Sequence, residues 1–228
     1  VLADELRGHI AQALRCPHAN HVVQKLIGVG GPEEVQFIIE ELLCRPGMVG
    51  QTARHRYGCR IIQRLLQNSS PESVSAIAEE LMDDAQGLVC HTFGNYVMQC
   101  LLISGTDGQR QRIVATLRQM AAQCGRSSAG CAVIATALDH AEAADKASLA
   151  AALAHEPGLL LDMALSRLGN VTAVRVLQEL NGEELSRARS DLLKDSEALL
   201  HSRFGGPMAE LLGIEVNLGP CAEDDCGL

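Results

Sequence analysis

The chain has 228 residues, of which 47 % are hydrophobic and 2 % aromatic, so a disordered chain is excluded and helices packed through aliphatic side chains are favoured over a β-sandwich. The 28 acidic and 19 basic residues give a formal net charge of −9. Taken alone, this charge argues against a nucleic-acid-binding protein, although a repeat protein can be acidic on its convex face and neutral or basic along its concave face.

Clusters of glycine, proline and asparagine divide the chain at residues 28–32, 68–71, 105–108 and 181–182. After the second break, Ser70, Pro71 and Glu72 form a typical helix start, with a hydroxyl cap, a proline in the first turn and an acid near the positive end of the helix dipole. Apolar residues at helical spacing predict a helix over residues 74–81, followed by a short break around residues 83–87. Each unit therefore predicts two helices.

A motif recurs in the second helix of each unit. Residues 19–27, 58–66 and 94–102 share one form: a small residue, Asn or Cys, a flat side chain, two apolar residues, Gln, a variable residue and two apolar residues. Weaker copies follow at residues 130–135, 169–174 and 205–210. Numbered from the Asn or Cys, position one falls at 20, 59, 95, 131, 170 and 206, so the copies are spaced by 36 or 39 residues. This spacing predicts an all-α solenoid of six two-helix repeats over residues 1–213, with residues 214–228 as an acidic tail.

Helical geometry divides each motif into two faces. The apolar pairs are expected to face the core, together with the leucine four residues after the first apolar residue: Val22–Val23 with Leu26, Ile61–Ile62 with Leu65, and Val97–Met98 with Leu101. Positions one, two and five are expected to point elsewhere, and positions one and five lie one turn apart on the same face. Stacking of the repeats would align these faces into one ribbon.

The ribbon residues form three sets, which are Asn20, His21 and Gln24; Cys59, Arg60 and Gln63; and Asn95, Tyr96 and Gln99. Amides offer both donors and acceptors, so the side chains at positions one and five can meet the edge of a base. The flat side chain at position two can stack on a base, which contributes about 1–3 kcal/mol per base. The ribbon therefore predicts single-stranded nucleic-acid binding.

These motifs resemble the Pumilio (PUF) family, through the strings NHVVQ, CRIIQ and NYVMQ and the phrases HRYGCR at 55–60 and HTFGNY at 91–96. The resemblance implies a right-handed solenoid whose concave face binds single-stranded RNA, one base per repeat. It further implies that Asn with Gln reads uracil, that Cys with Gln reads adenine, and that the N-terminal repeat lies towards the RNA 3′ end. The three sets would then read 5′-U-A-U-3′. The family role implies a cytoplasmic monomer that binds messenger 3′ untranslated regions and recruits protein co-repressors for repression or decay.

The later copies depart from this pattern. The fourth has Cys131, Ala132 and Ala135, which supply neither a stacking group nor a hydrogen-bonding group at position five. The fifth set is also incomplete, and in the sixth Pro207 predicts a remodelled helix start. The fourth repeat is therefore expected to tolerate any nucleotide.

Several other residues have more than one interpretation. Lys25 and Arg64 follow the glutamine of their repeats, and phosphate contact and simple solvation are both open. His55 and His91 recur at one repeat position, where packing and capping are preferred to a metal site or a catalytic pair because no third ligand accompanies them. The nine cysteines include no CxxC pair and are expected to be reduced, buried thiols of an intracellular protein.

Two alternatives to mRNA binding remain. One is a protein-binding solenoid of the armadillo or HEAT kind, and the other is a divergent PUF protein that acts in ribosomal RNA processing in the nucleolus. No nucleophile–base–orienter set and no phosphate loop are present, so neither an enzyme nor a cofactor is expected. No apolar run approaches the roughly 20 residues that span a bilayer, so no membrane association is expected.

Overall fold

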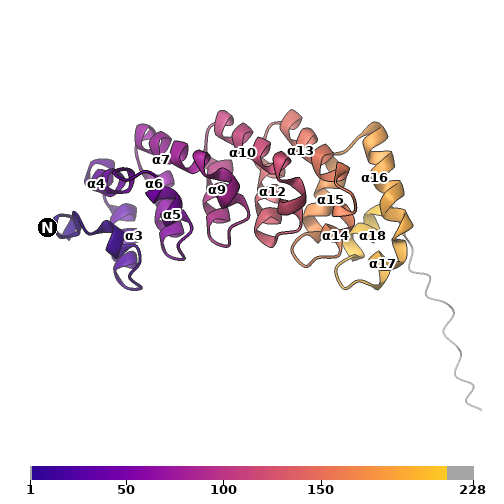
Figure 1. Ribbon diagram of the computed structural model, residues 1–228, viewed down its shortest axis with the longest axis horizontal. Coiled ribbons are helices and arrows are strands. Elements are labelled where there is room, and N and C mark those ends of the chain that lie inside the picture. The colour runs from indigo at the N-terminus through magenta and orange to yellow at the C-terminus, as the bar shows by residue number, and fades with distance from the viewer. Residues whose placement is uncertain (1, 215–228) are drawn as a thin grey trace, which may run out of the picture.

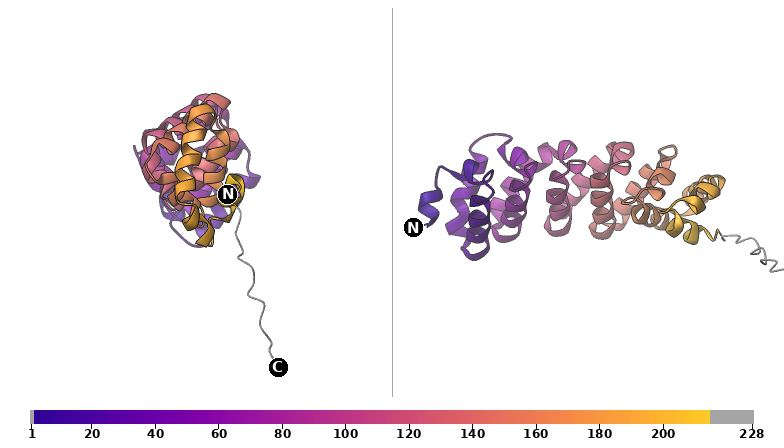
Figure 2. Two further views of the ribbon diagram at one scale, coloured as in Figure 1. Left: turned by 90° about the vertical axis from the view of Figure 1, so that its right-hand side faces the viewer. Right: turned by 90° about the horizontal axis from the view of Figure 1, so that it is seen from below.

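The computed structural model describes residues 2–214, and within that range all regular elements are helices. The helices form a single file of six stacked repeats (Figure 1), seen end-on and from below in Figure 2. The helices pack against helices of their own repeat and, in most cases, of a neighbouring repeat. The predicted tail lies outside the described residues except for Ile214, and so do Cys221 and Cys226.

The first three repeats are built from nine helices. Repeat one contains α1 (Leu2–Leu6), α2 (Ile10–Ala13) and α3 (Ala19–Val29). Repeat two contains α4 (Pro32–Leu43), α5 (Met48–Ala53) and α6 (Gly58–Asn68), and repeat three contains α7 (Pro71–Asp83), α8 (Ala85–Val89) and α9 (Gly94–Ser104).

The last three repeats follow the same order. Repeat four contains α10 (Asp107–Gln119), α11 (Ala121–Gly125) and α12 (Ser128–His140). Repeat five contains α13 (Ala143–His155), α14 (Leu159–Ala164) and α15 (Asn170–Glu179), and repeat six contains α16 (Gly182–Lys194), α17 (Ser196–His201) and α18 (Gly206–Leu212).

Repeats two to six thus consist of a long helix, a short helix and a motif helix, so the predicted two-helix unit was incomplete. The break expected at residues 83–87 is shorter than predicted, because α7 ends at Asp83 and α8 already begins at Ala85. A helix of five residues is too short to show a 3.6-residue apolar period. The predicted breaks between repeats are confirmed, since each separates a motif helix from the next long helix, and the Ser70 hydroxyl accepts a hydrogen bond from the Ser73 amide at 3.3 Å.

The small residue that opens each motif lies where the motif helix crosses the short helix. A side chain on Gly58 would meet the backbone of Thr52, and one on Gly130 would meet the backbone of Cys124. The corresponding glycines of repeats three, five and six face the same obstruction. In repeats two to six glycine is therefore required by the close approach of two helices, whereas repeat one has Ala19 at this position.

A second regular feature fixes the loop before each motif helix. The residue four before position one accepts a hydrogen bond from a backbone amide two or three residues later in every repeat; these acceptors are Cys16, His55, His91, Ser127, Ser166 and Ser202. The Nδ1 atom of His91, for example, accepts from the amides of Phe93 and Gly94, each at 3.1 Å. The capping role predicted for His55 and His91 is confirmed by these hydrogen bonds.

The core runs as one continuous apolar cluster through all six repeats. The apolar pairs of the second and third motifs are fully buried, as predicted, but Val22 of the first pair is 38 % exposed. Its counterparts Ile61 and Val97 are covered because α3 packs on α6 and α6 packs on α9. No helix within the described chain precedes α3 in the row, so this part of the core prediction is wrong for Val22.

The cysteines are only partly as predicted. Within residues 2–214 all seven are free thiols, and Cys59, Cys100, Cys124 and Cys131 are buried. Cys44, however, is exposed, and Cys16 and Cys90 are half-buried. Across the described residues, no helix combines the length and the hydropathy needed to cross a membrane.

Candidate functional site

The motif helices α3, α6, α9, α12, α15 and α18 follow one another in a row, each packed on the next. Along this row the flat residues at position two face solvent. His21 and Arg60 are exposed, and Tyr96 is 52 % exposed. The second-position side chains of three consecutive repeats are therefore free to meet a ligand.

Position one behaves differently from the expectation that it points away from the interior. Asn20, Cys59 and Asn95 are buried. The Nδ2 atom of Asn95 donates to the carbonyl oxygens of His91 at 2.8 Å and Thr92 at 2.9 Å, and Asn20 makes the same pair of bonds to Cys16 and Pro17. In repeat two the Cys59 thiol donates to the Arg56 carbonyl at 3.7 Å. The residue at position one thus closes the loop before its own helix.

The side chain at position one orients the glutamine side chain at position five. The Nε2 atom of Gln24 donates to Oδ1 of Asn20 at 2.9 Å, and Gln99 donates to Asn95 over the same distance. The predicted pairing of positions one and five across one helical turn is confirmed for these two repeats. Gln63 has Cys59 as its neighbour instead, and its side-chain amide has no hydrogen-bond partner within residues 2–214. Repeat two therefore offers a free amide where repeats one and three offer an oriented one.

A groove of about 360 Å³ lies between the second and third repeats. Its walls are Arg60 on α6 and Tyr96 on α9, and Cys59 and Gln63 also line it. Phe93 and Arg56 complete the lining, although no role was predicted for them from the sequence. The available signal was the aromatic residue two before position one, which recurs as Tyr57, Phe93 and Phe204.

A second groove of about 290 Å³ lies between the third and fourth repeats. Asn95 and Tyr96 line it from repeat three, and Ser127 and Ala132 are among the residues that line it from repeat four. Tyr96 therefore stands between two successive grooves. The half-buried thiol of Cys90 also lines the second groove.

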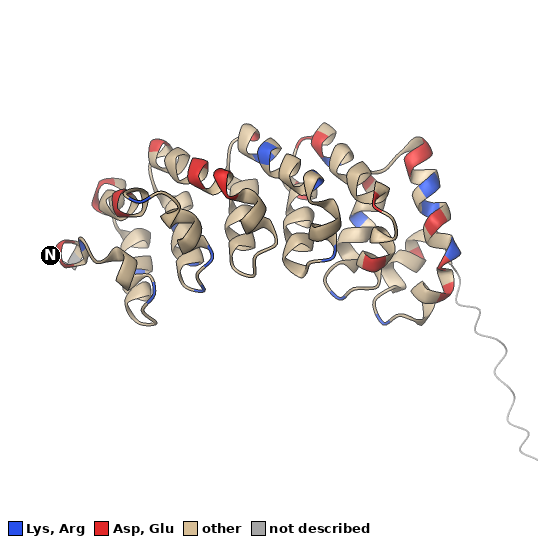
Figure 3. Ribbon diagram, viewed as in Figure 1, with Lys and Arg blue, Asp and Glu red and all other residues tan. Residues whose placement is uncertain are grey.

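The charge distribution answers the objection raised by the acidic composition. The motif helices α3, α6 and α9 contain Lys25, Arg60 and Arg64 and no acidic residue. The acids of the same repeats gather on the long helices, as Figure 3 shows, for example Glu33 and Glu34 on α4. The ribbon of the first three repeats is therefore neutral to basic within an acidic chain.

Lys25 and Arg64 are both exposed, on neighbouring helices. Arg64 Nε donates to Oε1 of Gln24 at 3.4 Å, so it bridges position five of repeat one from repeat two. Thr136 makes the equivalent bond from repeat four to Gln99, at 3.3 Å. In repeats two and four, the residue after position five thus contacts the glutamine side chain of the preceding repeat.

Repeats four to six have the same order of helices, but their motif helices present fewer polar side chains at positions two and five. Cys131 is buried and Ala132 is only partly exposed, whereas Val171 at position two of repeat five is 60 % exposed. In repeat six the motif helix has seven residues and begins at Gly206, which is position one, as the motif helix of repeat five does, so Pro207 does not change where this helix begins. These repeats present little to hydrogen-bond a base.

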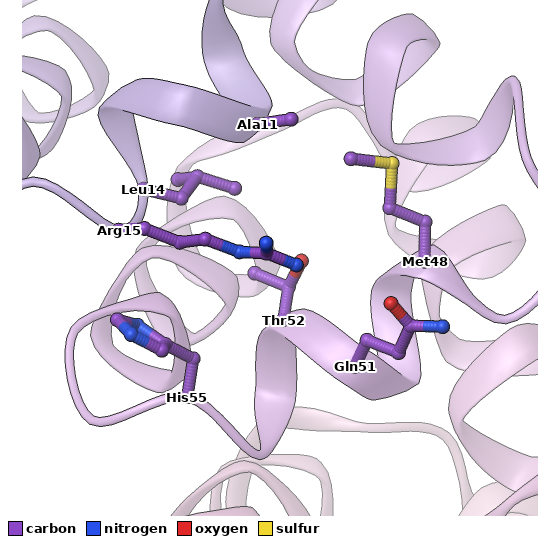
Figure 4. A pocket seen from close by; sticks show the side chains of 7 residues that line it. All are labelled: Ala11, Leu14, Arg15, Met48, Gln51, Thr52 and His55. Atoms are coloured by element: carbon purple, nitrogen blue, oxygen red, sulfur yellow. The ribbon is translucent and has the colours of Figure 1, made fainter.

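The residue five before position one forms a link to the following repeat. In repeat two Arg54 is ion-paired with Asp84, and in repeat four Arg126 is ion-paired with Asp162 at 3.0 Å. In repeat three the equivalent residue is Cys90, whose sulfur lies 3.2 Å from Cys124 Sγ of repeat four. In repeat one Arg15 extends into a pocket of about 160 Å³ lined by Met48, Gln51, Thr52 and His55 (Figure 4), where no carboxylate lines the wall. The residue at this one position therefore makes a different kind of contact with the following repeat at successive joints between repeats.

Metal binding finds no support in the described part of the chain. No group of three or more His, Cys, Asp or Glu side chains could hold a metal ion among residues 2–214. The Nδ1 atoms of His55 and His91 are directed at backbone amides instead.

Three segments of the chain match the model of a known family. The PUF family, described as a Pumilio-family RNA-binding repeat, matches residues 15–43, 49–82 and 87–117. Each matched segment contains one of the motif helices α3, α6 and α9, together with all or most of the long helix that follows it. No curated protein sequence matches the chain.

Solved structures extend the likeness in fold to the later repeats. The crystal structure of PUF-8 in complex with PBE-RNA has a TM-score of 0.78 and 22 % identity, over 91 % of this chain and 62 % of that one. The Puf3 RNA-binding domain bound to a Cox17 RNA 3′ UTR recognition sequence has a TM-score of 0.77 and 16 % identity, over 90 % of this chain and 58 % of that one. A Puf4 double mutant bound to a Cox17 RNA 3′ UTR recognition sequence has a TM-score of 0.76 and 22 % identity, over 92 % of this chain and 66 % of that one. The predicted α-solenoid is confirmed, and the chain spans about three fifths of the length of the first two structures.

Proposed function

We propose that the chain is a PUF repeat domain that binds single-stranded RNA with one base per repeat, because three segments of its first repeats match the PUF family model and its fold matches PUF structures. The three solved structures compared above are bound to RNA, two of them to 3′ UTR recognition sequences. We infer that this chain likewise binds messenger 3′ untranslated regions, as a cytoplasmic monomer that recruits protein co-repressors.

The groove between the second and third repeats is the observation that carries this proposal. A base that enters it lies between the guanidinium of Arg60 and the ring of Tyr96, both of which are exposed. The unpartnered amide of Gln63 then meets its edge. The volume of about 360 Å³ falls within the roughly 300–1,000 Å³ typical of ligand sites. Stacking on both faces with one polar contact at the edge is how single-stranded nucleic acids are held by aromatic and arginine side chains.

The proposed recognition sequence is 5′-U-A-U-3′, read by Asn95 with Gln99, Cys59 with Gln63, and Asn20 with Gln24. In this proposal the buried asparagines act chiefly by orienting their glutamines, while the cysteine leaves its glutamine free to turn. The fourth repeat, with Cys131, Ala132 and Ala135, accepts any nucleotide, so affinities for the four bases opposite it differ by less than about tenfold, or 1.4 kcal/mol.

The substitution Cys59→Asn tests the proposed code. It supplies an amide oxygen beside Gln63 and makes repeat two equivalent to its two neighbours. We expect the preferred base to change from adenine to uracil, with a discrimination of about 1–3 kcal/mol. The dissociation constants of RNAs that contain 5′-UAU-3′ and 5′-UUU-3′ are measured for both proteins, with Cys131→Asn as the control that leaves the preference at this base unchanged.

The outcome also separates the alternatives. A parent chain that binds neither RNA would favour a protein-binding solenoid of the armadillo or HEAT kind. Binding without discrimination between adenine and uracil would mean that positions one and five are not the reader. An unbiased RNA selection that returned structured ribosomal sequences would favour the nucleolar role in ribosomal RNA processing.

A further inference from the structure

Two thiols meet at the joint between repeats three and four. Cys90 ends α8, and Cys124 lies on α11 of the next repeat, 34 residues later. Their sulfur atoms are 3.2 Å apart, which is direct contact without a covalent bond. We propose that Cys90 and Cys124 are a peroxide-reactive thiol pair that closes to a disulfide between the third and fourth repeats.

The register of the fold explains why these two side chains meet. Cys90 occupies the position from which Arg54 and Arg126 reach an aspartate of the following repeat. The stacking of repeats thus directs this side chain across the joint whatever its chemistry. At the third joint the directed group is a thiol, and the group it meets is another thiol.

The two sulfurs differ in accessibility, which assigns their roles. Cys90 is half-buried and lines the groove that also contains Asn95 and Tyr96, so a small oxidant can reach it. Cys124 is fully buried. Cys90 is therefore the thiol that is oxidised first, and Cys124 is the thiol that resolves the product.

The local electrostatics agree with this order. A hydrogen bond from the Cys124 thiol lowers the pKa of Cys90 below its usual value, and the Ser127 hydroxyl acts in the same direction against the effect of burial. The same contact with Cys90, together with burial, raises the pKa of Cys124. Because the thiolate is the reactive form, Cys90 is the nucleophile of the pair.

The chemistry balances with one equivalent of hydrogen peroxide. The Cys90 thiolate attacks one peroxide oxygen, the O–O bond breaks, and the departing hydroxide takes up the proton lost from Cys90 to form water. The sulfur of Cys124 then attacks the resulting sulfenic acid, and the hydroxyl group leaves with the Cys124 proton as a second water. Two thiols are oxidised to one disulfide, and one peroxide is reduced to two waters.

A third thiol and an exposed thiol provide contrasts. Cys131 is buried beside the pair, but its sulfur donates to the Gly125 carbonyl at 3.1 Å and does not line the groove. Cys44 is exposed, and its thiol donates to the Glu41 carbonyl at 3.0 Å. Cys44 therefore has the accessibility of a reactive thiol without a resolving partner.

Peptide mapping without reduction tests the proposal and does not depend on RNA binding. The reduced full chain is treated with one equivalent of hydrogen peroxide, blocked with N-ethylmaleimide and digested with trypsin. Cys124 is the single cysteine of the tryptic peptide 119–126, and Cys90 lies in peptide 65–110 together with Cys100. We expect these two peptides to appear joined by a disulfide, two hydrogens lighter than the summed masses of peptide 119–126 and of peptide 65–110 alkylated at Cys100.

Cysteine variants identify which two sulfur atoms form the disulfide. Cys90→Ser should reduce the joined species at least tenfold and return peptide 119–126 in its alkylated form, while Cys44→Ser and Cys100→Ser should leave the joined species unchanged. Full alkylation of Cys124 in the oxidised parent chain would overturn the proposal. So would a joined species that persists in Cys90→Ser, or overoxidation of Cys90 to the sulfinic acid without any crosslink.

Discussion

Asparagine at position one has two separable tasks in each intact motif. Its Nδ2 atom holds two carbonyls of the preceding loop, and its Oδ1 atom orients the glutamine one turn later. A residue that would be read from sequence as a base contact is therefore also part of the frame. Glutamine at position five has no such tie to the loop.

Asn95→Ala and Gln99→Ala should separate these tasks. Asn95→Ala leaves the carbonyls of His91 and Thr92 short of a donor in a part-buried site and should lower the free energy of unfolding by about 1–3 kcal/mol. Gln99→Ala should weaken RNA binding with a smaller loss of stability. Chemical denaturation and RNA titration of both variants check this, and equal destabilisation by the two would contradict the assigned division.

Tyr96 offers the clearest test of stacking, since it lines both grooves and is 52 % exposed. Tyr96→Ala should weaken RNA binding by about 1–3 kcal/mol and leave the melting temperature nearly unchanged. Val171→Ala is the matched control, because Val171 occupies position two of repeat five and is 60 % exposed. If the two substitutions change the dissociation constant equally, Tyr96 does not stack on a base.

At the scale of the element, the histidine side chains that accept hydrogen bonds in the loops before α6 and α9 make these two helices sensitive to pH. Nδ1 of His91 must be unprotonated to accept from the amides of Phe93 and Gly94, and burial lowers the pKa of both His55 and His91. The neutral imidazole is thus favoured in the folded chain. The contribution of each histidine to stability is complete above the unfolded pKa of about 6.5 and is lost as the pH falls through the lower folded value.

The double variant His55→Ser, His91→Ser should remove this dependence while keeping the caps, because serine fills the same position in repeats four to six. Thermal melts at pH 7.5 and 5.5 should show a smaller difference for the variant than for the parent chain. A parent whose melting temperature does not fall faster than that of the variant would show that the two caps do not respond to protonation.

The elements differ in how far the sequence predicts them. The motif helices and the breaks between repeats were predictable because a motif of nine residues recurs at nearly constant spacing. The short helices α5 and α8 were not, since five or six residues hold less than two turns and their apolar period cannot be read. The burial of Asn20 and Asn95 depends on loop carbonyls that only the folded chain brings within reach.

The contacts that join repeats were also beyond the sequence. Arg54 and Asp84 lie 30 residues apart, and Cys90 and Cys124 lie 34 apart, with no local spacing to mark them. They follow from the register of stacking, which becomes visible only when equivalent positions of successive repeats are superposed in space. Arg56 of the first groove was missed for the same reason, whereas Phe93 had a signal in the aromatic residue that recurs two residues before position one.

For the whole molecule, packing restricted to neighbouring repeats predicts that damage stays local. Leu199 is fully buried in repeat six, and Leu199→Ala should destabilise that repeat by about 2–5 kcal/mol. Hydrogen exchange should then accelerate in α16 to α18 and remain nearly unchanged in α4 to α9. Uniform acceleration along the chain would mean that all six repeats unfold as one cooperative unit.

The alternation of links along the row has a mechanical consequence. Ionic joints soften as salt screens them, whereas a joint of two thiols in contact does not respond to ionic strength. The links at these joints therefore differ in their response to salt. High salt is expected to weaken the ionic contacts on either side of the thiol joint and to leave the contact between the two thiols as it is.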